Sequence, residues 1–127
     1  MSRALRPTWD AYFLSIAIAV SARADCQRRR HGAVIVDRFN RVIATGYNGT
    51  PPGDERSCIG GDCPRALSDA PHNEGTYDDC IALHAEQNAI ANAARDMRGG
   101  RIFVTGEPCG MCSKLVAAAG LTAVWPS

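Results

Sequence analysis

The chain has 127 residues, of which 46% are hydrophobic and 21% charged, and its formal net charge is +1. This length supports a single core, so we expect one domain over residues 1–127. The near-neutral charge gives no electrostatic basis for wrapping a nucleic-acid backbone, and a nucleic-acid partner is therefore not expected. The only basic run, Arg28-Arg29-Arg30, is either a solvated turn or a local phosphate clamp.

The first predicted element is an amphipathic helix near the N-terminus, with Thr8 as its N-cap. Apolar side chains recur there at helical spacing: Trp9, Tyr12, Phe13, Ile16, Ala17 and Val20. The same stretch has features of a signal peptide, but its helical period favours a helix of the folded domain. The apolar run is too short to cross a bilayer, so we expect a soluble chain and no membrane partner.

The cysteine spacing indicates a metal protein. Six cysteines could form three disulfides in a secreted domain or serve a metal in a reducing compartment: Cys26, Cys58, Cys63, Cys80, Cys109 and Cys112. Because Cys109 and Cys112 form a Cys-x-x-Cys pair, with histidines elsewhere and no convincing export signal, zinc and a cytoplasmic location are favoured.

Two short apolar runs, at residues 32–36 and 41–48, flank a polar turn at 37–40. This pattern predicts a β-hairpin, and its continuous apolar character predicts strands covered on both faces. Residues 49–79 then form a loop rich in Gly, Pro, Asp and Ser, and a loop of this length is usually functional or held by a ligand.

Several candidate metal ligands lie in or beside the 49–79 loop. We consider a second, structural zinc there, with the alternative that these are small buried cysteines and a surface histidine. The candidate ligands are Cys58, Cys63, His72 and Cys80, with Cys26 as a further one.

The second half of the chain alternates between helix and strand. We expect a helix over 80–98, a strand over 101–105, a helix over 111–119 ended by Gly120, and a last strand over 121–125. Strands joined by helices imply parallel pairs with right-handed crossovers. The predicted fold is α/β: a three-layer α-β-α sandwich with a mixed sheet of about four or five strands.

The strongest chemical signal combines His84, Glu86, Cys109 and Cys112. One histidine and two cysteines form the three-ligand set of a catalytic zinc, whose fourth position holds water. Glu86 is near the metal without being needed as a ligand, so it can carry protons. If Cys112 lies in the first turn of a helix, the free N–H groups there should favour its thiolate.

His-x-Glu with Pro-Cys-x-x-Cys is the pattern of zinc-dependent nucleobase deaminases. The chain resembles the deoxycytidylate (dCMP) deaminases of the cytidine deaminase-like superfamily. The motifs that carry the resemblance are CQRRRHGAVIV at 26–36, TGYNGTP at 45–51, CIALHAEQNAI at 80–90 and VTGEPCGMCSKL at 104–115.

The resemblance implies roles for individual residues. It makes Glu86 the proton carrier and Asn48 a contact to the deoxyribose 3′ hydroxyl. It places an arginine, either Arg28 or Arg29, at the 5′-phosphate. Ala33 and Val34 would form the wall of the base pocket, although core packing explains them equally well. The family commonly continues past the fourth strand with a Tyr or Arg near the phosphate, and Arg65 is a candidate replacement for that contact.

The activity implied is hydrolysis of dCMP to dUMP and ammonia with one catalytic Zn²⁺. The resemblance also implies a homo-oligomer, a hexamer or a dimer, and regulation by dCTP and dTTP, with Mg²⁺ only where a nucleotide regulates. Three alternatives stay open: a deaminase of another cytosine nucleotide or nucleoside, including 5-modified dCMP; a tRNA or polynucleotide deaminase; and a non-catalytic zinc module.

Overall fold

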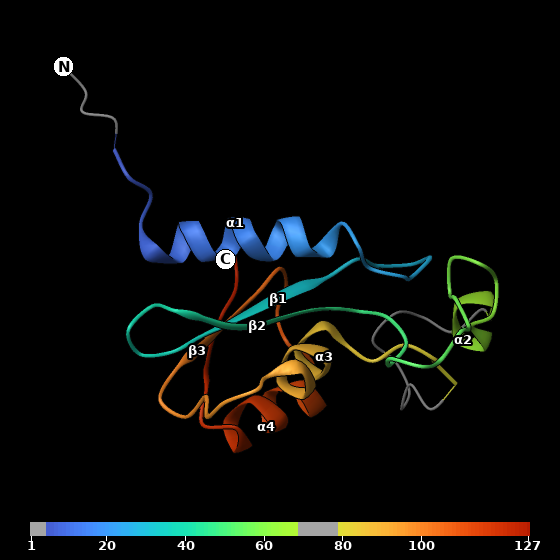
Figure 1. The fold of residues 1–127 in the computed structure, drawn as a ribbon. Helices are drawn as coiled ribbons and strands as arrows, with labels where there is room; N and C mark the ends of the chain where they lie inside the picture. Colours follow the sequence, from blue (N-terminus) through green and yellow to red (C-terminus); the bar gives the residue numbers. More distant parts are fainter. Residues whose placement is uncertain (1–4, 69–78) are drawn as a thin grey trace.

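A four-stranded sheet lies between α1 on one face and α3 with α4 on the other (Figure 1). The computed structural model describes residues 5–68 and 79–127. Its strands are β1 (Gly32–Val36), β2 (Val42–Tyr47), β3 (Arg101–Val104) and β4 (Thr122–Val124), and its helices are α1 (Trp9–Ser21), α2 (Pro64–Leu67), α3 (Ala85–Asn92) and α4 (Gly110–Ala118). The strand order is β2-β1-β3-β4, with β1 antiparallel to both neighbours and β3 parallel to β4. The predicted mixed α/β sandwich is confirmed.

Helix α1 begins as predicted, because the Thr8 hydroxyl accepts a hydrogen bond from the Ala11 N–H at 3.1 Å. Phe13 and Ala17 are buried against the sheet. Trp9 and Tyr12, at the first turn of the predicted apolar stripe, are instead 54% and 44% exposed. The helical period therefore identified the packed face correctly, but the sheet covers only part of it.

The two strands of the hairpin differ in burial. Every residue of β1 is buried, as predicted, whereas Val42, Thr45 and Tyr47 of β2 are exposed. The prediction that both strands are covered on both faces is wrong for β2, because this strand forms the edge of the sheet. Apolar composition alone does not distinguish an edge strand from a central one.

Two glycines allow the helices to approach the sheet closely. A Cβ atom at Gly32 would lie 2.0 Å from the Ala17 carbonyl oxygen of α1, and one at Gly46 would lie 2.2 Å from the Ala89 nitrogen of α3. Backbone atoms fill the space that a side chain would need on both faces of the hairpin. These positions hold α1 and α3 against opposite sides of the sheet.

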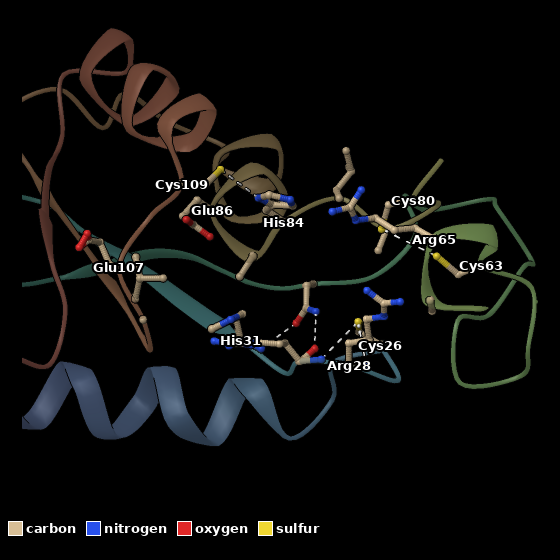
Figure 2. Close-up of a pocket in the computed structure, with 18 residues that line it drawn as sticks. Cys26, Arg28, His31, Cys63, Arg65, Cys80, His84, Glu86, Glu107 and Cys109 are labelled. Atoms are coloured by element: carbon tan, nitrogen blue, oxygen red, sulfur yellow. Dashed lines mark hydrogen bonds between the residues drawn. The ribbon is translucent and has the colours of Figure 1, made fainter. Parts of the chain in front are cut away.

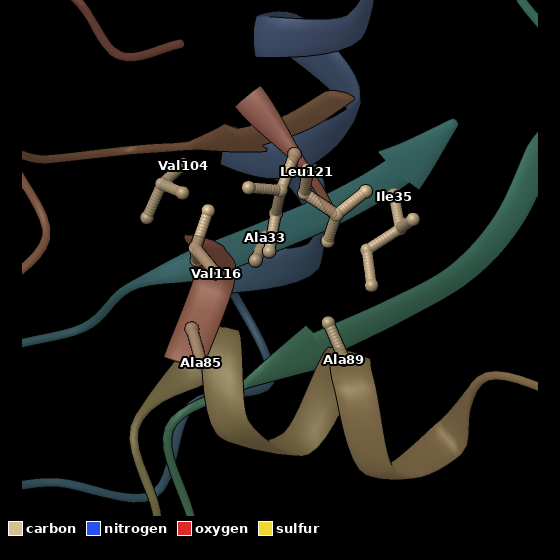
Figure 3. Close-up of a cluster of buried hydrophobic side chains, with 8 residues drawn as sticks. Ala33, Ile35, Ala85, Ala89, Val104, Val116 and Leu121 are labelled. Carbon is tan, nitrogen blue, oxygen red and sulfur yellow. The ribbon is translucent and has the colours of Figure 1, made fainter. Parts of the chain in front are cut away.

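The core has two parts because successive strand residues point to opposite faces. On the face of α3 and α4, Ala33 and Ile35 of β1 pack with helix residues including Ala85, Ala89 and Val116 (Figure 3). On the other face, Val34 and Val36 pack with α1 and Phe103. Both layers are thus joined through β1.

Helix α3 is shorter than predicted. It begins at Ala85 because His84 is extended (φ −70°, ψ 159°), and the His84 N–H donates to the Gln87 side-chain oxygen at 2.7 Å. The preceding Leu83 pairs with Gly49. The helix ends at Asn92, since Ala93 is extended, so the 80–98 prediction was wrong at both ends.

Within the 49–79 loop, α2 is an unpredicted single turn that begins with Pro64. The other helix bounds lie close to the predictions. In the part of the chain described, no helix is both long and apolar enough to cross a membrane.

Candidate metal centre and substrate cavity

The N-terminal ends of α3 and α4 meet and bring the three predicted zinc ligands together. His84 is the N-cap of α3, Cys109 is the N-cap of α4, and Cys112 is the third residue of α4. His84 Nδ1 lies 3.5 Å from Cys109 Sγ (Figure 2). The same nitrogen lies 3.2 Å from Cys112 Sγ. Nδ1 is therefore the nitrogen directed at the metal position.

This donor set fits zinc. Ligands about 2.0–2.3 Å from one tetrahedral zinc ion lie roughly 3.5 Å apart, close to the distances found. All three donor atoms lie within 4.8 Å of one another, and residues 5–68 and 79–127 contain no other such group of three. Three ligands leave one position for water, as in catalytic zinc sites.

The helix end does not by itself ionise Cys112. The residue lies in the first turn of α4, as predicted. Burial nevertheless raises the pKa of its thiol, and the negative charges of Glu86 and Cys109 raise it further. The first turn of the helix thus does not outweigh burial, and metal binding has to displace the proton.

Glu86 lies at the second position of α3 and is only 5% exposed. Its side chain lies beside His84 and Cys109 at one end of a cavity (Figure 2). The helix that carries it is fixed to the sheet by Asn88, whose amide nitrogen donates to the carbonyls of Tyr47 (2.8 Å) and Gly49 (3.2 Å). The carboxylate is thus placed by the backbone, next to the metal ligands.

The cavity has a volume of about 250 Å³ and two chemically different ends. His84, Glu86 and Cys109 lie at one end, and the guanidinium-bearing Arg28 and Arg65 lie towards the other (Figure 2). A ligand with a ring at one end and an anion at the other matches this arrangement.

Asn48 is buried and lines the cavity. Its amide oxygen accepts from the His31 N–H at 2.7 Å, and its amide nitrogen donates to the Arg29 carbonyl at 2.8 Å. The side chain therefore holds the arginine turn against the end of β2. An amide has one further donor and acceptor, which remain for a ligand hydroxyl.

All three predicted phosphate-binding arginines line the cavity. Arg65 is 6% exposed, and its guanidinium lies 3.6 Å from the Asp79 carboxylate. Arg28 donates to the Ser68 carbonyl. The structure thus brings the arginine turn and the 49–79 loop to one end of the cavity.

The base-pocket prediction for Ala33 and Val34 is not met. Both are fully buried in the core, Val34 faces α1, and neither lines the cavity. Strand alternation, which sends adjacent side chains to opposite faces, already excluded a shared wall. Val104 and His31 lie on the cavity instead, and sequence reasoning missed both.

The loop cysteines are partly assembled. Cys63 Sγ lies 3.9 Å from Cys80 Sγ, while Cys58 Sγ accepts from the Gln27 N–H at 3.2 Å and Cys26 Sγ from the Arg28 N–H at 3.4 Å. Burial opposes ionisation of Cys63, but the N–H groups of neighbouring residues lower its thiol pKa, whereas burial raises the pKa of Cys80. The fifth candidate, His72, lies outside the described residues.

Comparison with known proteins matches residues 7–126 to the cytidine and deoxycytidylate deaminase zinc-binding region. A deoxycytidylate deaminase of Mycobacterium phage D29 is 46% identical over 124 residues, covering 94% of each chain. The deoxycytidylate deaminase of Saccharomyces cerevisiae is 41% identical over 98% of this chain but only 39% of its own length.

Among solved structures, the dCMP deaminase of cyanophage S-TIM5 in complex with dCMP and dUMP superposes with a TM-score of 0.72. It is 29% identical, and the match covers 95% of this chain and 82% of that one. The fold, the His-Cys-Cys cluster and these matches agree, and the chain belongs to the cytidine and deoxycytidylate deaminase family.

Proposed function

We propose that this protein hydrolyses dCMP to dUMP and ammonia. The observation that carries the proposal is the single cavity that joins the candidate zinc ligands and Glu86 to a cluster of arginines. The dCMP and dUMP complex of the S-TIM5 relative supports the nucleotide assignment. In the orientation we propose for dCMP, the cytosine ring lies at the His84 end of the cavity and the 5′-phosphate at the Arg65 end.

His84, Cys109 and Cys112 would hold the zinc ion, which supplies an activated water when bound. Glu86 accepts a proton from the attacking water and delivers it to N3 of the ring. It then takes the remaining proton of that water from the hydroxyl group now bound to C4 and transfers it to the amino group, so that the C4–N bond breaks, ammonia leaves and the C4 carbonyl forms. Because its carboxylate is buried beside the ligands, bulk water competes little for these proton positions.

Arg65 is our choice for the phosphate contact among the three candidates, because it is the one buried on the cavity wall, where bulk water competes least with a charged hydrogen bond. Guanidinium and phosphate form paired charged hydrogen bonds. Arg65→Met should lower kcat/KM for dCMP by roughly 10- to 100-fold. Turnover of deoxycytidine, which has no phosphate, should change little, and an equal loss on both substrates would show that Arg65 acts only on the fold.

The activity is tested by following the loss of cytosine absorbance with zinc-loaded protein on dCMP, CMP and a 5-substituted dCMP. The proposal predicts that dCMP is the best substrate and that dUMP accumulates with equimolar ammonia. A clear preference for CMP or for the 5-substituted nucleotide would reassign the substrate. Absence of ammonia from all three would favour a non-catalytic zinc module.

We also propose a second, structural zinc at the loop cysteines. The approach of Cys63 to Cys80, at 3.9 Å between sulfurs, supports it, as do the N–H groups that lower the pKa of Cys63. Two sulfurs bound to one zinc lie at about this separation. Metal analysis should give close to two zinc ions per chain, and Cys63→Ser close to one. A wild-type ratio of one would remove the second site.

A homo-oligomer, either a hexamer or a dimer, is a further proposal. Large apolar side chains exposed on helices support it, with Trp9, Tyr12 and Ile18 on α1 and Met111 on α4. We further propose regulation by dCTP and dTTP, with Mg²⁺ as their counter-ion, on the basis of the family resemblance. A cytoplasmic location is proposed because the metal centre needs reduced thiols.

A further inference from the structure

His31 immediately precedes β1 and is fixed by its backbone. Its N–H donates to the Asn48 amide oxygen at 2.7 Å, and its carbonyl accepts from the Asn48 N–H at 3.3 Å. The side chain is half-buried and lines the cavity that holds Glu86 and His84. His31 has no role in the reaction described above.

The imidazole ring is held against the end of β3. Its Nδ1 lies 3.1 Å from the Thr105 hydroxyl oxygen, which also accepts from the Gly32 N–H at 3.1 Å. The next residue, Gly106, leaves room for the ring, since a Cβ atom there would lie 3.0 Å from Cε1 of His31. One edge of the ring therefore rests on Thr105 and Gly106.

The second ring nitrogen, Nε2, is not buried. Among the described residues no hydrogen bond reaches Nε2, and no buried side-chain nitrogen or oxygen there is left without a partner. Nε2 is consequently accessible, on a side chain that lines the cavity. Such an atom is available to a ligand.

Burial favours the neutral form of this ring. Burial lowers the pKa of His31, the Glu86 carboxylate opposes this, and the charges of Arg29 and His84 lower the pKa further. A neutral imidazole carries one proton. The Thr105 hydroxyl accepts from Gly32, so its own hydrogen can go to Nδ1, which leaves the ring proton on Nε2.

We propose that His31 determines specificity by donating a hydrogen bond from Nε2 to an oxygen atom of the bound nucleotide. The acceptor is the base carbonyl O2 or the deoxyribose 3′ oxygen, since Glu86 serves the N3 and amino positions. This inference rests on the proposed function, because it takes a cytosine nucleotide as the occupant of the cavity.

Two variants distinguish the hydrogen-bond donor at Nε2 from the packing of the ring. His31→Phe keeps a planar side chain without a donor, and His31→Gln places an amide nitrogen near the position of Nε2. The Phe variant should bind dUMP about tenfold more weakly in calorimetry and show a similar loss in kcat/KM for dCMP. The Gln variant should recover most of both, while zinc content and melting temperature stay at wild-type values in each.

Substrate analogues identify the acceptor. In wild type, either 2-thio-dUMP, which weakens the O2 acceptor, or 2′,3′-dideoxy-UMP, which lacks the 3′ oxygen, should bind more weakly than dUMP. In His31→Phe, the analogue that binds wild type more weakly should bind with the same affinity as dUMP, because the hydrogen bond is already absent.

Equal dUMP affinity of wild type and His31→Phe would overturn the inference, and so would additive losses with both analogues. In either case wild type still deaminates dCMP, and the proposed function stands. A wild type that neither binds dUMP nor releases ammonia from dCMP would overturn the proposed function, and the inference would fall with it.

Discussion

Glu86 has a position on α3 that suits the proton transfer proposed for it. It is 5% exposed, lies on the cavity wall, and follows the candidate ligand His84 by two residues. At the second helical position its backbone N–H is one of those without an intrahelical acceptor, which favours a carboxylate there. Its side chain nevertheless lies in the cavity, beside the metal ligands (Figure 2).

The Glu86→Gln variant tests this role by replacing the carboxylate with an amide. The amide keeps the size of the side chain but cannot accept and return a proton, so kcat on dCMP should fall by roughly 10²–10⁴. Zinc content and melting temperature should be retained. Activity within tenfold of wild type in a zinc-loaded variant would assign proton transfer to another group.

At the scale of elements, the hairpin positions the helix that carries Glu86. Gly46 of β2 lies against α3, where a Cβ would be 2.2 Å from the Ala89 nitrogen and 2.5 Å from the Ala85 carbonyl oxygen. Since α3 carries Glu86 and follows His84, the separation between this helix and the sheet also sets the depth of the cavity.

Gly46→Ala should therefore destabilise the fold by about 1–3 kcal/mol, because backbone atoms have to move apart. Gly110→Ala is the matched control, since a Cβ at Gly110 has no atom within 4 Å. Urea unfolding should separate the two variants. Equal midpoints for Gly46→Ala and wild type would show that α3 does not pack this closely on β2.

Asp37, in the turn between β1 and β2, links the hairpin to the segment after α3. Its carboxylate accepts from the N–H groups of Phe39 and Arg41 and from the Arg95 guanidinium at 3.0 Å. Desolvation raises its pKa, but these hydrogen bonds together outweigh it and lower the pKa from 3.8 to about 2. A depressed pKa stabilises the folded state above pH 4, and the contribution is lost as the pH falls from about 4 to about 2.

Wild type should accordingly be more stable than Asp37→Asn at pH 6, and the difference should shrink as the pH falls through that window. Thermal melts at a series of pH values measure it. A difference in melting temperature that is independent of pH would mean that ionisation of the Asp37 carboxyl contributes nothing to the stability of the fold.

Across the whole molecule, the sequence predicted what depends on local pattern. The spacing of His84 and Glu86, and of Cys109 and Cys112, predicted groups that the structure brings together, since each pair lies at the start of one helix. Strand β1 was predicted with its observed bounds from its apolar run, and this run is continuous because all five residues are buried. These features need no knowledge of distant contacts.

The remaining features depend on tertiary contacts. His31 is separated from Thr105 by 74 positions, so its orientation towards the cavity could not be predicted locally. The exposure of β2 depends on its place at the sheet edge, and the start of α3 depends on Leu83 pairing with Gly49. The arginine-lined end of the cavity likewise joins two distant segments, the turn at Arg28 and Arg29 and the segment around Arg65.

In the binding mode we propose, a single cavity binds the base at the metal centre and the phosphate at the arginines. The most direct measurement compares kcat/KM of the zinc-loaded protein for dCMP and for deoxycytidine, scored by ammonia release. We predict that dCMP is preferred by at least about 100-fold, as expected for a buried charged contact. Equal values, or a preference for deoxycytidine, would contradict this binding mode.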